Sequence, residues 1–108
     1  MKHVMIDIET LGWQDPVLLS LGAIQFDKDG SCFNEFYEKI DIDSCLNIGL
    51  GLNGRTLRWW NEQSEEARME AIGGEQDIRK PVQLVLHEFY KWYTKIHPSE
   101  TLIWANGS

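Results

Sequence analysis

Two carboxylates near the N-terminus, Asp7 and Glu9, are the residues best suited to do chemistry. They are two apart in a segment with strand periodicity, so both side chains point to one face, with Cα atoms roughly 6.6 Å apart. Because oxygen-only ligands favour hard cations, Mg²⁺ or Mn²⁺ is the expected metal. Two such ions about 4 Å apart can activate a water and stabilise the departing oxygen in phosphodiester cleavage. The pair therefore predicts a divalent-cation site.

The alternative is that this pair is solvated at the surface, which is the commonest situation of an Asp-x-Glu sequence. Two local features favour the metal site. The acids lie at the C-terminal end of an otherwise apolar strand, in which Val4, Ile6 and Ile8 alternate with them. The turn sequence Thr10-Leu11-Gly12 follows immediately.

The segments that must position the acids are predicted to be further strands. Residues 17–26 form a nearly continuous apolar run, as in a central strand covered on both faces. A turn at 27–30 leads to a returning strand over 32–42, which predicts an antiparallel meander. Residues 43–54 are rich in glycine and asparagine and are predicted to form a loop.

The second half of the chain is predicted to be mainly helical. Short helices are expected over 56–63 and, after the N-cap Ser64, through residue 72. The clearest helix runs from Pro81 to His97 and is stopped by a proline, and residues 101–104 form a last short strand. The order β-β-β-α-α-β predicts an α/β layered fold.

Composition indicates one small globular domain with an acidic surface. The 108 residues include ten basic and seventeen acidic side chains, for a net charge of −7. This charge argues against a passive nucleic-acid-binding module, because phosphate neutralisation supplies most of the affinity in such proteins. It leaves a nuclease open, since carboxylates loaded with divalent cations present positive charge.

The two cysteines and the absence of long apolar stretches indicate the compartment. Cys32 and Cys45 have neither metal-ligand nor redox spacing, so free thiols in a reducing cytoplasm are expected. No stretch approaches the length of a membrane span. We therefore expect a cytoplasmic protein with no membrane partner.

Three segments resemble known exonucleases. Residues 5–12 resemble the first motif of the DEDD superfamily, the ribonuclease H-like 3′→5′ exonucleases, whose core has the order β-β-β-α-β. Residues 56–68 are similar to a Thr-x-x-Trp-Trp-x-x-Gln-Ser-x-x-Ala-Arg pattern of the phage DexA-type exonucleases and their exoribonuclease-like relatives. Residues 102–107 resemble the strand that leads into the second motif of these enzymes. The resemblance spans the chain, and its long second segment is the most specific part.

The resemblance implies a role for each residue of the first motif. Asp7 and Glu9 would be catalytic metal ligands of a two-metal site for Mg²⁺ or Mn²⁺. Thr10 would hydrogen-bond the 3′-terminal nucleotide, Leu11 would pack against its base, and Gly12 would belong to the same substrate-binding turn. The expected partner is the 3′ end of a single strand of DNA or RNA.

The end of the sequence departs from the family pattern. Asn106 is expected where the loop approaches the active site, but the chain ends at Ser108, before the third acidic ligand of these families. Their general-base His and fourth Asp have no counterpart. Residues 1–108 are therefore interpreted as the N-terminal portion of a single exonuclease domain, with its C-terminal part missing. The alternative is an inactive fragment that acts as an interaction module and forms homo-oligomers through an uncovered sheet face.

The adjacent tryptophans and two arginines have alternative interpretations. Trp59 and Trp60 could stack on bases, as aromatics do in single-strand binders. Adjacent helical residues point about 100° apart, so packing roles are favoured over one shared binding surface. Arg55 and Arg58 are interpreted equally well as phosphate contacts or as solvated surface arginines.

Overall fold

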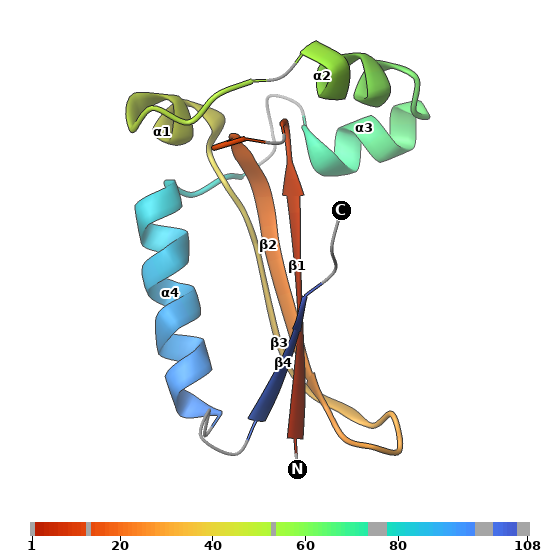
Figure 1. Ribbon diagram of the computed structural model, residues 1–108, viewed down its shortest axis with the longest axis vertical. Helices are drawn as coiled ribbons and strands as arrows, with labels where there is room; N and C mark the ends of the chain where they lie inside the picture. Colours follow the sequence, from red (N-terminus) through yellow and green to blue (C-terminus); the bar gives the residue numbers. More distant parts are fainter. Residues whose placement is uncertain (1, 13, 53, 74–77, 97–100, 106–108) are drawn as a thin grey trace.

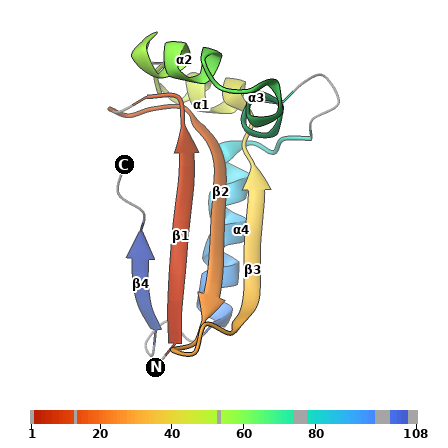
Figure 2. The same ribbon diagram turned by 90° about the vertical axis from the view of Figure 1, so that its right-hand side faces the viewer.

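A mixed four-stranded sheet is the centre of the fold (Figures 1 and 2). The computed structural model describes residues 2–12, 14–52, 54–73, 78–96 and 101–105. In this part of the chain, β1 (Lys2–Thr10), β2 (Leu18–Phe26) and β3 (Cys32–Lys39) form an antiparallel meander. β4 (Thr101–Ala105) pairs in parallel with the other edge of β1, giving the order β3-β2-β1-β4. The predicted α/β class is confirmed.

Four helices of the described residues occupy two positions around the sheet. The long α4 (Val82–Lys95) runs along one face. α1 (Ile42–Asn47), α2 (Gly54–Asn61) and α3 (Glu65–Ala71) gather at the end of the sheet where β1 ends (Figure 1). None of these helices combines the length and the apolar character that crossing a membrane requires. Thus α4 covers one face of the sheet, and the three short helices α1, α2 and α3 cover one end of it.

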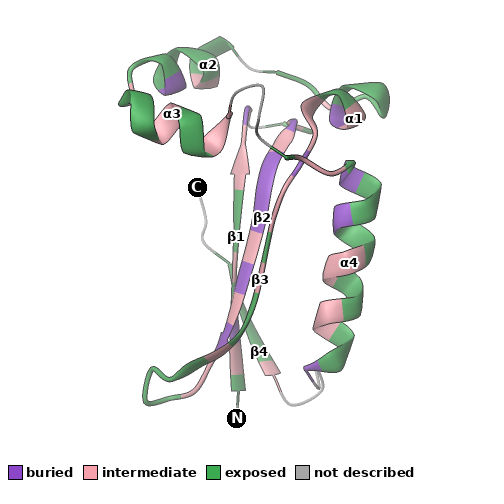
Figure 3. Ribbon diagram, turned by 180° about the vertical axis from the view of Figure 1, so that it is seen from behind, coloured by how far each residue is buried: buried purple, intermediate pink, exposed green. Residues whose placement is uncertain are grey.

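The core lies between the sheet, α4 and α1 (Figure 3). On the α4 side, the buried residues Val4, Ala23 and Ile96 pack with the aromatic face of the helix. No residue of β2 is exposed, as expected for a strand with neighbours on both edges. The largest cluster of buried residues consists of Leu11, Val17, Leu19, Leu21, Ile40, Cys45, Trp60, Val82 and Val85.

Capping residues determine where several helices begin. Ser64 is the N-cap of α3, and its side chain accepts a hydrogen bond from the Ala67 amide at 3.1 Å, which confirms the predicted start. Pro81 is the N-cap of α4, so the helix begins one residue after the predicted start. The prediction of a loop over 43–54 is wrong in its first half, because this segment contains most of α1. The side chain of Asp41 caps α1 by accepting from the Ser44 amide at 3.0 Å.

Candidate functional site

The two acids lie on the sheet face opposite α4, because side chains alternate along β1 and Val4 faces the helix. Two cross-strand rows form the floor of the site. Glu9 is paired with Ser20, which is paired with Lys39. Asp7 is paired with Gly22, which is paired with Tyr37. Directly paired residues share a face, so the carboxylates lie beside a small residue and a glycine rather than beneath large side chains.

The backbone immediately after Glu9 is irregular and firmly held. The β1–β2 register shifts between Glu9 and Thr10, which is the position of a bulge or irregularity. Such shifts are frequent beside active sites, where they redirect a side chain and end strand pairing. The Thr10 hydroxyl donates to the Gly12 carbonyl at 2.9 Å, and the Leu11 amide donates to the Val17 carbonyl at 2.9 Å. The turn therefore fixes the end of the strand that carries both acids.

α2 and α3 build walls above this floor and enclose a cleft of about 460 Å³. Functional ligand sites commonly fall between about 300 and 1,000 Å³, so the cleft is large enough for a nucleotide. Its lining combines carboxylates, aromatic rings and small residues from β1, β2, β3, α2, α3 and the turn between the two helices: Asp7, Glu9, Ser20, Gly22, Tyr37, Trp59, Trp60, Gln63, Ala67, Glu70 and Ala71.

Two side chains attach these walls to the sheet. Trp60 is only 8% exposed, and its indole N–H donates to the Thr10 carbonyl at 3.5 Å, which connects α2 to the end of β1. Arg79 donates to the carbonyls of Leu19, Ile40 and Ala71, the last of which ends α3. The position of each wall is thus determined by contacts with the strands beneath it.

The carboxylates make the cleft electrostatically negative. The pKa of Glu9 is raised above its ordinary value of 4.5, first because the side chain is partly buried and second because Asp7 is charged nearby. On the far wall, Glu70 lies 4.0 Å from the Lys39 ammonium and accepts a long hydrogen bond of 3.5 Å from the Tyr37 hydroxyl. Glu70 is therefore partly balanced, whereas Asp7 and Glu9 repel each other and attract a cation.

The two acids fit a hard divalent cation in chemistry and orientation. Both supply oxygen ligands and both face the cleft. The pKa of Glu9 is raised first by burial and second by the charge of Asp7. Among the described residues, no three His, Cys, Asp or Glu side chains are arranged to hold a metal together. In this part of the chain, Glu70 therefore does not join Asp7 and Glu9 in a three-residue cluster.

The structure separates the acids from the turn predicted to bind substrate. Thr10, Leu11 and Gly12 do not line the cleft. Leu11 is only 3% exposed and belongs to the core, so its side chain has almost no surface available to a base. Asn106 lies outside the described residues.

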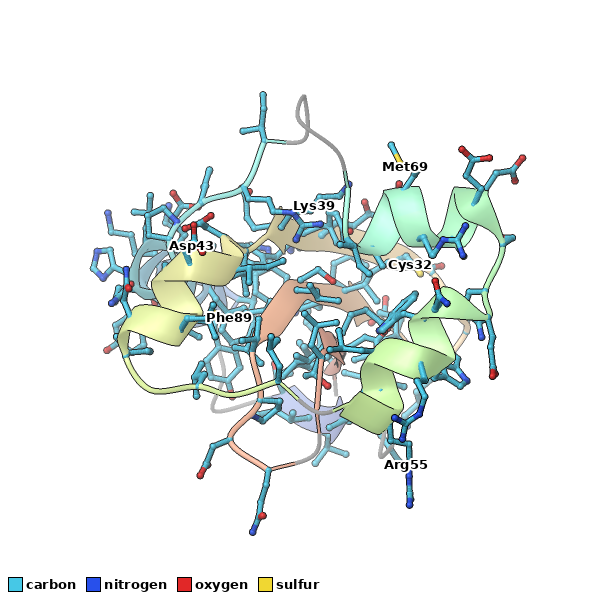
Figure 4. The ribbon with its side chains drawn as sticks, turned by 90° about the horizontal axis from the view of Figure 1, so that it is seen from above. Cys32, Lys39, Asp43, Arg55, Met69 and Phe89 are labelled. Atoms are coloured by element: carbon cyan, nitrogen blue, oxygen red, sulfur yellow. The ribbon has the colours of Figure 1, made fainter. Side chains whose placement is uncertain are left out.

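Several cleft residues were not identified from the sequence. Tyr37 and Glu70 have no local pattern that marks them, because the packing of α3 against β3 brings them together. Gln63 belongs to the Trp-Trp-x-x-Gln pattern but was given no role. Trp60 is buried, which confirms its predicted packing role, whereas Trp59 is exposed in the cleft. Arg55 projects outward from α2, away from the sheet (Figure 4).

The fold and site together define an α/β domain with an acidic cleft above the end of its central strands. The chain matches the family model of the 3′-5′ exoribonuclease Rv2179c-like domain over residues 2–108. The protein belongs to this exoribonuclease-like family. No protein of curated function matches the chain significantly.

Proposed function

We propose that this domain is a metal-dependent 3′→5′ exonuclease that hydrolyses phosphodiester bonds at the 3′ ends of single-stranded nucleic acid. The observation that carries the proposal is the pair Asp7 and Glu9, which share one face at the end of β1 and line a cleft of about 460 Å³. Membership of a 3′-5′ exoribonuclease-like family supports the same reaction and favours RNA as the substrate.

In the proposed reaction, the residues of β1 and β2 at the base of the cleft each have a role. Asp7 and Glu9 hold Mg²⁺ or Mn²⁺, and these cations supply the positive charge that stabilises attack of water on the scissile phosphate. The rigid end of β1 keeps the two carboxylates in register with each other. Gly22, which has no side chain, leaves room beside Asp7 for the phosphate. A bound cation would favour the charged form of Glu9, whose pKa is raised by partial burial and by the nearby Asp7.

We further propose that the domain is ribonuclease H-like, belongs to the DEDD superfamily and is closest to the phage DexA-type enzymes. The sheet order β3-β2-β1-β4 supports this assignment, as do the three strands that precede the helices and the fourth strand that follows them in the described residues. In this scheme residues 1–108 form the N-terminal portion of one exonuclease domain. The third and fourth acidic ligands and the general-base His would come from sequence outside these residues.

The proposed substrate contacts follow the same family resemblance. Thr10, Leu11 and Gly12 form the turn that approaches the terminal nucleotide, and Asn106 is assigned to the same substrate contacts. The Thr10 hydroxyl donates to Gly12 but its oxygen still accepts hydrogen bonds. Contact between Leu11 and a base requires the turn to move aside, because Leu11 is part of the core.

The test combines metal binding with degradation of a 5′-labelled strand. Mn²⁺ binding to the chain is measured by electron paramagnetic resonance, beside Asp7→Asn and the matched control Asp43→Asn, an exposed acid on α1. RNA and DNA single strands are then incubated with each protein and Mn²⁺. Binding and stepwise 3′ shortening that are lost only in Asp7→Asn support the proposal. Equal Mn²⁺ binding by Asp7→Asn and the wild type contradicts it.

We also propose that the open sheet face associates with a second copy of the chain. Met5 and Trp104 are 38% and 50% exposed on this face, and Leu102 lies two residues before Trp104 on β4. Exposed apolar side chains on neighbouring strands favour association. Sedimentation of wild type and Trp104→Ser tests this: a wild type that stays monomeric at high concentration excludes it.

A cytoplasmic location is proposed from the cysteines. Cys32 is exposed and Cys45 is buried, and both are free thiols. An exposed free thiol is stable in a reducing compartment.

A further inference from the structure

The side chain of Trp104 joins β4 to β1 by a contact that requires a neutral histidine. Its indole N–H donates to Nδ1 of His3 at 3.0 Å. An indole N–H can only donate, and a neutral imidazole has one acceptor nitrogen, whereas a protonated imidazole has two donors and no acceptor. The contact therefore requires the tautomer of His3 that carries its proton on Nε2.

Stacking holds the imidazole in place. Its ring centroid lies 5.1 Å from that of Phe26, the β2 residue paired with His3, and the two planes meet at 18°. The centroid of the Trp104 ring is 6.1 Å away on the other side of β1, on the edge strand β4 (Figure 2). Side chains alternate along β1, so His3 shares the sheet face of Asp7 and Glu9 but lies at the opposite end of the strand.

The neighbouring strands offer His3 no charge that would compensate for its protonation. β2 and β4 contain neither acidic nor basic residues. On β1 itself, the Lys2 ammonium lies over the Phe33 ring, 5.5 Å from its centroid, and would repel a second cation. The nearest other titratable side chains of the described residues are Asp7 on β1, Asp27 after β2, and Cys32 and Glu35 on β3.

None of these four groups is placed to bind a protonated His3. Asp7 lies four residues, or roughly 13 Å, farther along β1. Asp27 directly follows Phe26, so strand alternation directs it to the opposite face. β2 separates both β3 residues from β1. Protonation of His3 therefore removes an acceptor without supplying a new partner.

The position of β4 depends on few contacts. Among the described strands, β4 pairs only with β1, and four of its five residues are exposed. The last of these pairs joins Ala105 to Ile6, the residue directly before Asp7. The hydrogen bond between Trp104 and His3 adds a side-chain contact to this short backbone pairing. Loss of that contact therefore weakens the strand edge beside the carboxylates.

We propose that His3 and Trp104 form a pH-sensitive latch, in which protonation of His3 releases the Trp104 indole and loosens β4 from β1. Histidine side chains ordinarily change charge near about pH 6.5, so the latch is closed above this pH and opens in mild acid. In the open state the indole N–H faces a second N–H donor, and the hydrogen bond is replaced by repulsion. The latch rests on the strand contact alone and does not depend on the proposed exonuclease function.

The experiment follows the indole N–H of Trp104 by NMR from roughly pH 5 to 8. Protein labelled with ¹⁵N-tryptophan gives an indole signal for each of its five tryptophans, and Trp104→Phe identifies the one that belongs to Trp104. Hydrogen exchange of this group is measured at a concentration at which sedimentation shows a monomer. The compared proteins are wild type, His3→Asn, His3→Phe and the matched control His87→Asn, which alters an exposed histidine on α4.

The two His3 variants separate the acceptor from the ring. Asparagine provides a neutral acceptor at every pH, whereas phenylalanine keeps the stacking on Phe26 but has no acceptor. In the wild type, protection of the Trp104 indole from exchange should fall roughly 2- to 10-fold as the pH drops through about 6.5, and the β4 amides should lose protection with it.

The variants should separate cleanly at mildly acidic pH. His3→Asn should keep its indole protection throughout, His3→Phe should lack it throughout, and His87→Asn should behave as the wild type. Wild-type indole protection that does not change over this pH range overturns the latch. A loss of protection that persists in His3→Asn also overturns it, because another group would then be responsible.

Discussion

The two neighbouring tryptophans allow one prediction to be worked through in detail. Replacing Trp60 by Ala removes a ring that is 8% exposed and a hydrogen bond to the Thr10 carbonyl. A fully covered aromatic side chain buries about 200 Å², so its loss should lower the free energy of unfolding by about 3–5 kcal/mol. Trp59 is 52% exposed, so the same replacement there should cost about 1–2 kcal/mol.

The size of this effect makes it easy to measure. A domain of this length has a free energy of unfolding of about 5–15 kcal/mol, and each 1 kcal/mol lowers Tm by about 4–8 °C. Trp60→Ala should therefore lower Tm by at least about 12 °C. Far-UV circular dichroism is the appropriate assay, because it reports unfolding without depending on tryptophan emission. Titration with urea gives the free energy of unfolding, and heating gives Tm.

A third variant separates the ring from its hydrogen bond. Trp60→Phe keeps most of the apolar volume but cannot donate to Thr10, so about 1–2 kcal/mol should be lost. Because the contact lies one residue after Glu9, Mn²⁺ affinity should fall in both Trp60 variants. Equal costs for Trp60→Ala and Trp59→Ala would refute the assignment of one ring to the core and the other to the cleft.

Three other changes test the floor, a wall and the charge of the cleft. Gly22→Val should reduce Mn²⁺ affinity roughly 10-fold. A Cβ atom at this position would lie 3.4 Å from the Tyr37 ring, and the added methyl groups would crowd Asp7. An unchanged Mn²⁺ affinity in a calorimetric titration would contradict this prediction. Arg79→Met should lower the free energy of unfolding in urea by about 2–3 kcal/mol, because three carbonyls lose a charged donor; a loss below about 0.5 kcal/mol would show that water replaces the guanidinium. Because the pKa of Glu9 is raised, the metal-free folded protein binds a proton at Glu9 more tightly than the unfolded chain does. The free energy of unfolding should therefore decrease as the pH rises through 4.5 toward the pKa of Glu9 in the folded protein. Glu9→Gln should remove this decrease and be the more stable protein at neutral pH, and parallel pH profiles of the two proteins would disprove the link.

Much of the fold was predictable because local patterns agree with the final packing. The alternation around Asp7 and Glu9, the apolar run of β2 and the cap at Ser64 each specify an element that the structure contains. α1 was missed because the helical spacing of Ile42, Cys45 and Leu46 extends over little more than one turn, and the helix is stabilised by the Asp41 cap and the burial of Cys45. In a glycine-rich segment, a capping residue and one buried side chain are not enough to predict a helix from the sequence.

The site was predictable only where it lies on a single element. The spacing of Asp7 and Glu9 places both on one face of a strand, whatever surrounds them. The walls depend on which helices pack over that face, so the contributions of Tyr37 and Glu70 required the tertiary structure. Trp59 and Trp60 could be expected to differ, but the sequence did not say which one faces the cleft.

The pairing of β4 with β1 has a consequence for the order of folding. Lys2 is paired with Thr101 and Ile6 with Ala105, so the central strand completes its hydrogen bonds with residues almost a full chain length away. The β1–β2–β3 meander closes through short connections and can form early, whereas the β1–β4 contact has high sequence separation and is slow to form. During synthesis one edge of the strand bearing both carboxylates therefore stays open until residues 101–105 emerge, and native-state hydrogen exchange should find the amides of β4 among the least protected of the sheet.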